Sequence, residues 1–84
     1  MGERILVVED DDQLGAQIAD RLRREGYEVT WLRDGSEAAR ADPSAFSLVL
    51  LDLMLPGTYG LDLLKKLRKT SDVPVLIVTA RDHP

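Results

Sequence analysis

The sequence predicts an α/β fold with a parallel sheet. Short apolar runs rich in β-branched residues and leucine stop at an acid or a threonine, as expected of strands buried on both faces, and these runs occupy residues 4–8, 47–52 and 74–79. Segments with helical spacing of apolar residues lie between them. Strands that alternate with helices predict a parallel sheet, because right-handed crossovers place the helices on both of its faces.

Length and composition favour one small globular domain, residues 1–84. The chain has 84 residues, of which 44% are hydrophobic and 31% are charged. No apolar run approaches the roughly 18 residues that a membrane span needs. Cysteine is absent, which excludes disulfides and thiolate metal sites. No basic, apolar leader opens the chain, so we expect a cytoplasmic protein without membrane contact.

In the first half, the strand at residues 4–8 leads into an amphipathic helix capped by Asp11 or Asp12 and ended at Gly26. The apolar positions of this helix are Leu14, Ile18 and Leu22. A second strand is expected at residues 27–32, and its Trp31 is expected to be a packing or surface residue.

The turn residues Asp34, Gly35 and Ser36 then begin a short Ala-rich helix that ends before Pro43. A strand over 47–52 is followed by another amphipathic helix, before the last strand at 74–79. The apolar positions of that helix are Leu61, Leu64 and Leu67. The predicted order is therefore βαβαβαβ.

Charge is distributed unevenly. The net charge is −4, with 11 acids and 6 bases in residues 1–42 but 4 acids and 5 bases in residues 43–84. Nucleic-acid binding needs a clustered basic face, so we expect no direct contact with nucleic acid. The acidic half favours a cation site instead.

Acids follow two of the predicted strands. A run of four acids is usually a solvated loop with a helix cap, and Asp11 and Asp12 suit that role. Glu9 and Asp10, however, come directly after a buried strand, and Asp52 lies inside an apolar stretch where an unneutralised carboxylate is costly.

Ligands of open α/β sheets bind at the carboxyl ends of the strands. If the first and third strands are neighbours, Glu9, Asp10 and Asp52 converge there and repel one another. A hard cation would relieve this repulsion, and Mg²⁺ suits such a site because it binds carboxylates, a carbonyl and waters.

Three spaced motifs identify a resemblance. Ile5 to Asp11, Leu50 to Gly57 with Gly60-Leu61-Asp62, and Pro74 to Arg81 together resemble the receiver domain of two-component response regulators, in particular the OmpR/PhoB subclass. The resemblance covers the whole chain. It implies a flavodoxin-like (CheY-like) parallel sheet with helices on both faces.

The resemblance also implies a role for each site residue. Asp52 resembles the phosphoacceptor that takes a phosphoryl group from a sensor histidine kinase, in phosphorelay control of transcription. Asp10 resembles the direct Mg²⁺ ligand, Glu9 an outer acid acting through water, and Met54 the donor of a backbone carbonyl to the metal. Thr79 resembles the switch hydroxyl that bonds the phosphoryl group. Such a module assists its own phosphorylation and is not a stand-alone enzyme.

Compared with that family, the sequence stops after the fourth strand. The fifth strand, the last two helices and a phosphoryl-gripping lysine are absent, so we expect a truncated receiver domain. The open edge and the uncovered apolar faces then favour a homo-oligomer through the fourth strand.

Two alternatives remain open. One is an interaction or assembly fragment that cannot be phosphorylated. The other is a phosphatase of the haloacid dehalogenase type, which also uses an aspartate at a strand end; that class, however, needs a second aspartate where this chain has Met54.

Overall fold

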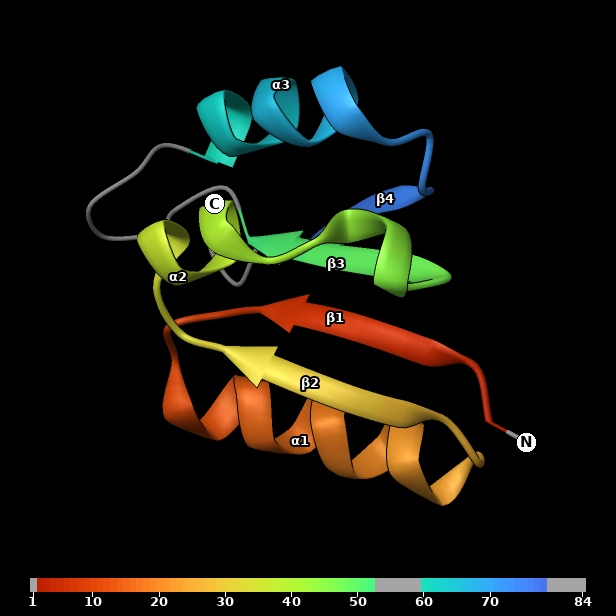
Figure 1. Ribbon diagram of the computed structural model, residues 1–84. Helices are drawn as coiled ribbons and strands as arrows, with labels where there is room; N and C mark the ends of the chain where they lie inside the picture. Colours follow the sequence, from red (N-terminus) through yellow and green to blue (C-terminus); the bar gives the residue numbers. More distant parts are fainter. Residues whose placement is uncertain (1, 53–59, 79–84) are drawn as a thin grey trace.

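A parallel sheet of four strands forms the centre of the molecule. The computed structural model describes residues 2–52 and 60–78. The strands are β1 (Arg4–Val8), β2 (Glu28–Leu32), β3 (Leu48–Asp52) and β4 (Val75–Val78). They pair in the order β2-β1-β3-β4, and every pair is parallel (Figure 1). The predicted alternation of strands and helices is confirmed.

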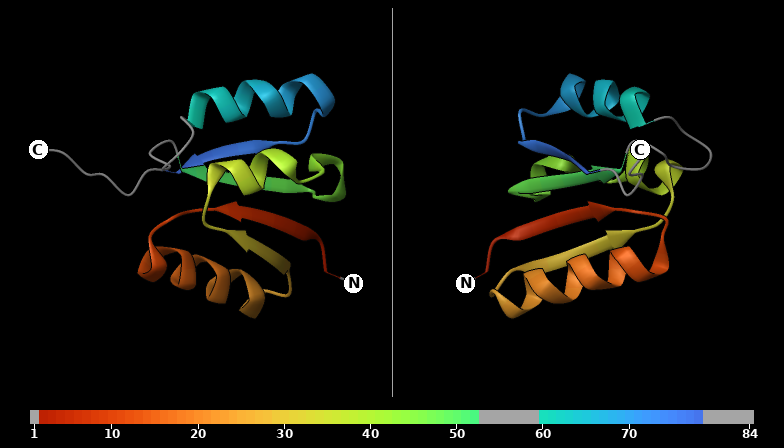
Figure 2. Two further views of the ribbon diagram at one scale, coloured as in Figure 1. Left: turned by 60° about the vertical axis from the view of Figure 1, so that its left-hand side comes forward. Right: turned by 180° about the vertical axis from the view of Figure 1, so that it is seen from behind.

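Helices cover both faces of this sheet. They are α1 (Asp12–Arg24), α2 (Gly35–Arg40) and α3 (Gly60–Thr70), with a 3₁₀ turn η1 (Pro43–Ala45) after α2. In Figures 1 and 2, α1 lies along β2 at one end of the sheet and α3 lies beside β4 at the other. None of the helices in the described part of the chain is long and apolar enough to cross a bilayer.

The two faces have separate cores. On the α1 side, Ile5, Val7 and Leu50 are buried against the apolar positions of the helix, Ile18 and Leu22. On the other side, β1 and β3 pack against α2 and α3. The buried residues of that larger core are Leu6, Val8, Ala38, Val49, Leu51, Leu63, Leu67 and Val73. Alternate residues of β1 and β3 therefore enter opposite cores, which explains why their sequences are continuously apolar.

The ends of α1 follow from local chemistry. Asp11 is the N-cap, and its Oδ1 accepts hydrogen bonds from the N–H groups of Gln13 at 2.9 Å and Leu14 at 3.1 Å. Of the two acids considered from the sequence, Asp12 is instead the first helical residue. Gly26 follows the C-cap with φ of 99°, a conformation that glycine adopts without the steric cost of a side chain.

The buried face of α3 differs from the one that the sequence predicted. Leu63 and Leu67 are buried, whereas Leu61 is 58% exposed. Leu63 and Leu67 are four residues apart and share the face that packs on β3, so Leu61 cannot lie on the same face. The predicted apolar series was therefore wrong at Leu61 but correct at Leu67 and at Leu64, which is partly buried against the same core.

Candidate functional site

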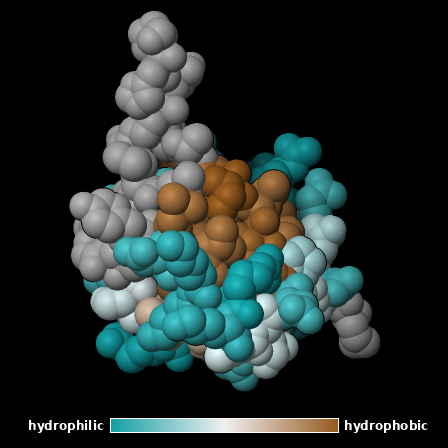
Figure 3. All heavy atoms as spheres, turned by 90° about the horizontal axis from the view of Figure 1, so that it is seen from above, coloured by the Kyte–Doolittle hydropathy of each residue, from teal (hydrophilic) through white to brown (hydrophobic). Residues whose placement is uncertain are grey.

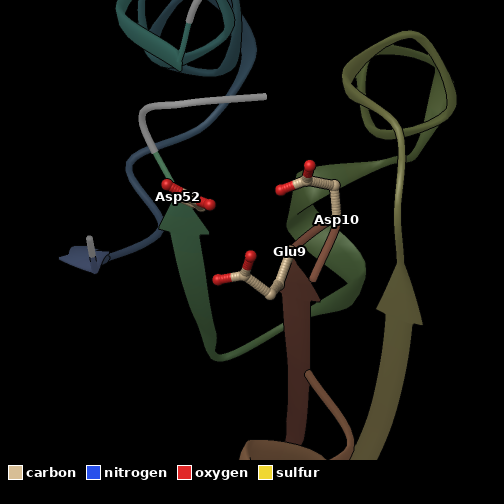
Figure 4. Close-up of side chains that lie close together, drawn as sticks. All are labelled: Glu9, Asp10 and Asp52. Atoms are coloured by element: carbon tan, nitrogen blue, oxygen red, sulfur yellow. The ribbon is translucent and has the colours of Figure 1, made fainter. Parts of the chain in front are cut away.

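Strand register places two acids side by side. Val8 of β1 pairs with Leu51 of β3, so the next residues, Glu9 and Asp52, stand at the same level at the carboxyl edge of the sheet. Asp10 follows Glu9 in the loop between β1 and α1. Figure 4 shows the three carboxylates turned toward a common space beyond the ends of β1 and β3.

The three carboxylates form a close cluster. One oxygen of each lies within 4.8 Å of the others. Glu9 and Asp52 are only 2% and 3% exposed, while Asp10 is half-buried. The sequence analysis predicted this convergence of Glu9, Asp10 and Asp52, and the structure confirms the proximity.

Burial dominates the electrostatics of Glu9. It raises the pKa of Glu9 from 4.5 to about 7, against the opposing effect of the Asp11 N–H, which donates to Oε2 at 3.1 Å. The neighbouring Asp52 adds to the increase in the pKa, both through its charge and because the two carboxylates can share a proton, and the charge of Asp10 adds to it as well. Without a cation, Glu9 therefore keeps a proton up to a higher pH than an ordinary glutamate does.

One carboxylate oxygen of Glu9 has no hydrogen-bond donor within the described residues. Oε1 is buried and, within the described part of the chain, no protein donor satisfies it. A buried carboxylate oxygen without a donor is costly. A cation at this cluster, together with the water it carries, would offset that cost and the repulsion, and an all-oxygen donor set suits Mg²⁺ or Ca²⁺ rather than a soft metal.

Two predicted site residues cannot be placed. Met54 and Thr79 lie outside the described residues. One contact was missed from the sequence: the indole of Trp31, expected only to pack, donates a hydrogen bond of 2.9 Å to the backbone carbonyl of Glu9. Since the two residues are 22 positions apart, only the pairing of β1 with β2 could have indicated it.

Comparisons with known proteins give one consistent result. The family model of the response regulator receiver domain matches residues 5–84. The sensory transduction protein RegX3 of Mycobacterium tuberculosis is 51% identical over 79 residues, which are 93% of this chain and 35% of RegX3. The chain thus spans about a third of the length of the curated relatives it matches.

Solved structures show the same fold. The receiver domain of HemR from Leptospira biflexa has a TM-score of 0.88 and 43% identity, covering 98% of this chain and 68% of that one. The receiver domain of the sensor histidine kinase PA1611 from Pseudomonas aeruginosa has a TM-score of 0.88 and 32% identity, covering 96% of this chain and 70% of that one, and holds a magnesium ion in its active-site cleft. The motifs, the sheet order, the acid cluster and these matches agree: the chain belongs to the response regulator receiver domain family.

Proposed function

We propose that this chain is a phosphorelay receiver module in which Asp52 accepts a phosphoryl group from a phosphohistidine of a sensor histidine kinase. The observation that supports this most is the position of Asp52, buried at the end of β3 within 4.8 Å of the carboxylates of Glu9 and Asp10. A carboxylate nucleophile that accepts a phosphoryl group needs positive charge close by, and the two neighbouring acids would provide it by holding a cation beside Asp52. In this proposal, residues 1–84 form a single receiver domain.

Mg²⁺ is the proposed cofactor. Asp10 and Asp52 would bind it directly, Glu9 would act through water, and the backbone carbonyl of Met54 would complete the protein ligands. When bound, the ion supplies positive charge that stabilises phosphoryl oxygens. Two features of Glu9 support this site: its buried Oε1 has no donor within the described residues, and burial beside two other acids raises its pKa, so the carboxylate is disfavoured unless a cation is near.

The transfer itself requires little from the protein beyond position and charge. A carboxylate oxygen of Asp52 forms a bond to phosphorus as the bond between phosphorus and the donor imidazole nitrogen breaks, and the electron pair of that bond stays on the nitrogen. In the proposal, the hydroxyl of Thr79 bonds the phosphoryl group afterwards. Asp52 is itself modified, so the module assists its own phosphorylation and is not a stand-alone enzyme.

The wider role is inferred from the relatives. They include BaeR of Escherichia coli, named a transcriptional regulatory protein, at 44% identity over 81 residues. We propose that this chain belongs to the same kind of regulator in the cytoplasm, and that the chain itself does not contact nucleic acid, as its net charge of −4 favours.

Self-association is the last part of the proposal. Within the described residues β4 pairs with β3 alone, and its Leu76 and Ile77 are 55% and 39% exposed. Figure 3, viewed from the side of α3 and β4, shows hydrophobic residues gathered in one patch with hydrophilic residues along much of its border. A strand edge with exposed apolar side chains favours pairing with a second copy of the chain.

Labelling with a small phosphodonor tests the phosphoacceptor. We expect acetyl phosphate and Mg²⁺ to add one phosphoryl group, as measured by intact-mass spectrometry. Asp52→Asn should abolish the addition, whereas Asp62→Asn, which changes an exposed acid in the first turn of α3, should retain it. Label that persists in Asp52→Asn would place the nucleophile elsewhere. Absence of label in a wild-type chain that binds Mg²⁺ would favour the interaction fragment.

A further inference from the structure

The side chain of Trp31 in β2 contacts the backbone of the acid cluster. Its Nε1–H donates to the carbonyl oxygen of Glu9 at 2.9 Å. The N–H of the same Glu9 donates to the carbonyl of Leu32 at 3.0 Å. Consecutive residues of β2 thus bind both polar backbone groups of Glu9, which fixes the point where the chain leaves β1 and enters the loop of carboxylates.

Helix α1 accommodates the indole at Gly15. A Cβ at this buried position would come within 2.6 Å of Nε1 of Trp31 and closer still to the six-membered ring. Alanine favours a helix more than glycine does, so the close approach of the ring explains the glycine. On the indole lies the guanidinium of Arg33, 4.2 Å from the ring centroid, and its Nε is 2.8 Å from Oδ1 of Asp12.

We propose that Trp31 is a positioning residue for Mg²⁺ binding: by holding the carbonyl of Glu9, it fixes the carboxylates of Glu9 and Asp10 in the arrangement that the ion needs. The proposal rests on the proposed Mg²⁺ site. Mg²⁺ demands near-ideal octahedral geometry, so a small displacement of its ligands lowers its affinity. Groups that orient metal ligands contribute to affinity without touching the metal.

Calorimetric titration with Mg²⁺ tests this role in three proteins: the wild type, Trp31→Phe and Val29→Ala. Phenylalanine keeps an aromatic ring but lacks the N–H donor. Val29 is the matched control, because it lies two residues away in β2 and packs against the same core cluster as Trp31. We expect Trp31→Phe to weaken Mg²⁺ binding roughly three- to tenfold, as for loss of one hydrogen bond. Val29→Ala should lower the melting temperature and leave the affinity unchanged.

A second variant disturbs the same contact from the other side. Gly15→Ala keeps the indole N–H but forces the ring away from α1, so it should weaken Mg²⁺ binding as Trp31→Phe does. Fluorescence provides an independent measurement, since Trp31 is the single tryptophan of the sequence. Mg²⁺ should change its emission with the midpoint that calorimetry gives, and Asp10→Asn should remove both signals.

The outcomes separate the two proposals. Wild-type affinity in both Trp31→Phe and Gly15→Ala would overturn the role of Trp31 and leave the Mg²⁺ site standing. An equal loss of affinity in Val29→Ala would also overturn it, because Trp31 would then act only through core packing. If the wild type gave neither heat nor a fluorescence change, the Mg²⁺ site would fail and the role of Trp31 with it.

Discussion

The backbone N–H of Asp11 donates to Oε2 of Glu9 at 3.1 Å, while the side chain of the same Asp11 caps α1. One residue therefore connects the start of a helix to the acid cluster. The hydrogen bond favours the charged form of Glu9, but burial has the larger effect, and the pKa of Glu9 stays raised at about 7.

Stability of the metal-free protein should fall as the pH rises toward neutrality. The pKa of Glu9 is about 7 in the folded chain, against an ordinary value of 4.5, so between these pH values the folded state binds more protons than the unfolded state. The stabilisation is complete below the lower value and is lost as the pH rises through the higher one. We expect a loss on the order of 1 to 3 kcal/mol, measured by urea unfolding with a chelator.

Glu9→Gln is the control. Glutamine does not titrate, so the stability of this variant should change little over the same pH range. The exposed carboxyls of Asp34 and Asp42 do not confuse the comparison. Hydrogen bonds from the hydroxyls of Ser36 and Ser44 lower the pKa of each below 3.8, so their effects lie at more acidic pH. Equal losses in the wild type and Glu9→Gln would contradict the assignment to Glu9.

Mg²⁺ should raise the melting temperature. A ligand that binds only the folded state at about ten times its dissociation constant stabilises by roughly 1.4 kcal/mol. For a domain of this size, that corresponds to an increase of about 5 to 10 °C. Asp10→Asn should lose the increase, whereas Asp20→Asn, on the exposed side of α1, should keep it. Equal responses in the two variants would mean that Mg²⁺ binds elsewhere.

Removal of the helix cap should destabilise the fold. Asp11→Ala deletes the acceptor for the N–H groups of Gln13 and Leu14, which costs about 1 kcal/mol in a typical helix. Its backbone N–H is retained, so the hydrogen bond to Glu9 can persist. Asp20→Ala, in the middle of α1, should cost nothing. Urea unfolding of both variants measures the difference, and similar values for the two would show that the cap is unimportant.

The burial pattern of α3 predicts a large contrast between two leucines. Leu63 is 1% exposed and Leu61 is 58% exposed. Leu63→Ala should cost roughly 2 to 5 kcal/mol, because it removes transfer free energy and leaves a cavity. Leu61→Ala should cost about 0.5 kcal/mol or less. Thermal or urea unfolding measures both losses of stability. A larger loss for Leu61→Ala than for Leu63→Ala would mean that Leu61 lies on the buried face of α3, as the sequence predicted.

Self-association through β4 should be sensitive to charge at its exposed positions. We expect wild-type protein at micromolar concentration to sediment as an oligomer, most simply a two-fold dimer. Leu76→Lys should shift it to the monomer, since a lysine on an edge strand opposes pairing. Tyr27 is a large hydrophobic residue beside β2, at the opposite edge of the sheet, and is 39% exposed, so Tyr27→Lys should have no effect. A cooperatively folded wild-type monomer would exclude the interface.

Much of the fold could be predicted from the sequence because its strongest signals are local or periodic. Residues 5–8 of β1 and 48–51 of β3 enter cores on both faces, so these runs are continuously apolar, and an acid directly after such a run stands out. Glu9 and Asp52 could therefore be placed at the carboxyl ends of their strands from the sequence, and their convergence followed on the condition that the two strands are neighbours, which the pairing of β1 with β3 meets. Turn and cap residues such as Asp34 and Gly26 act on their own neighbours and were equally visible.

Tertiary structure alone decided the rest, because it depends on contacts between distant segments. The buried face of α3 is selected by the core that β3 offers, so Leu63 rather than Leu61 packs there. The raised pKa of Glu9 arises from burial and from Asp52, 43 positions along the chain, while the hydrogen bond from Trp31 needs β2 to lie beside β1. The acids of the site could be identified from the sequence. Their distances, their pKa values and the hydrogen bonds that hold them depend on tertiary packing.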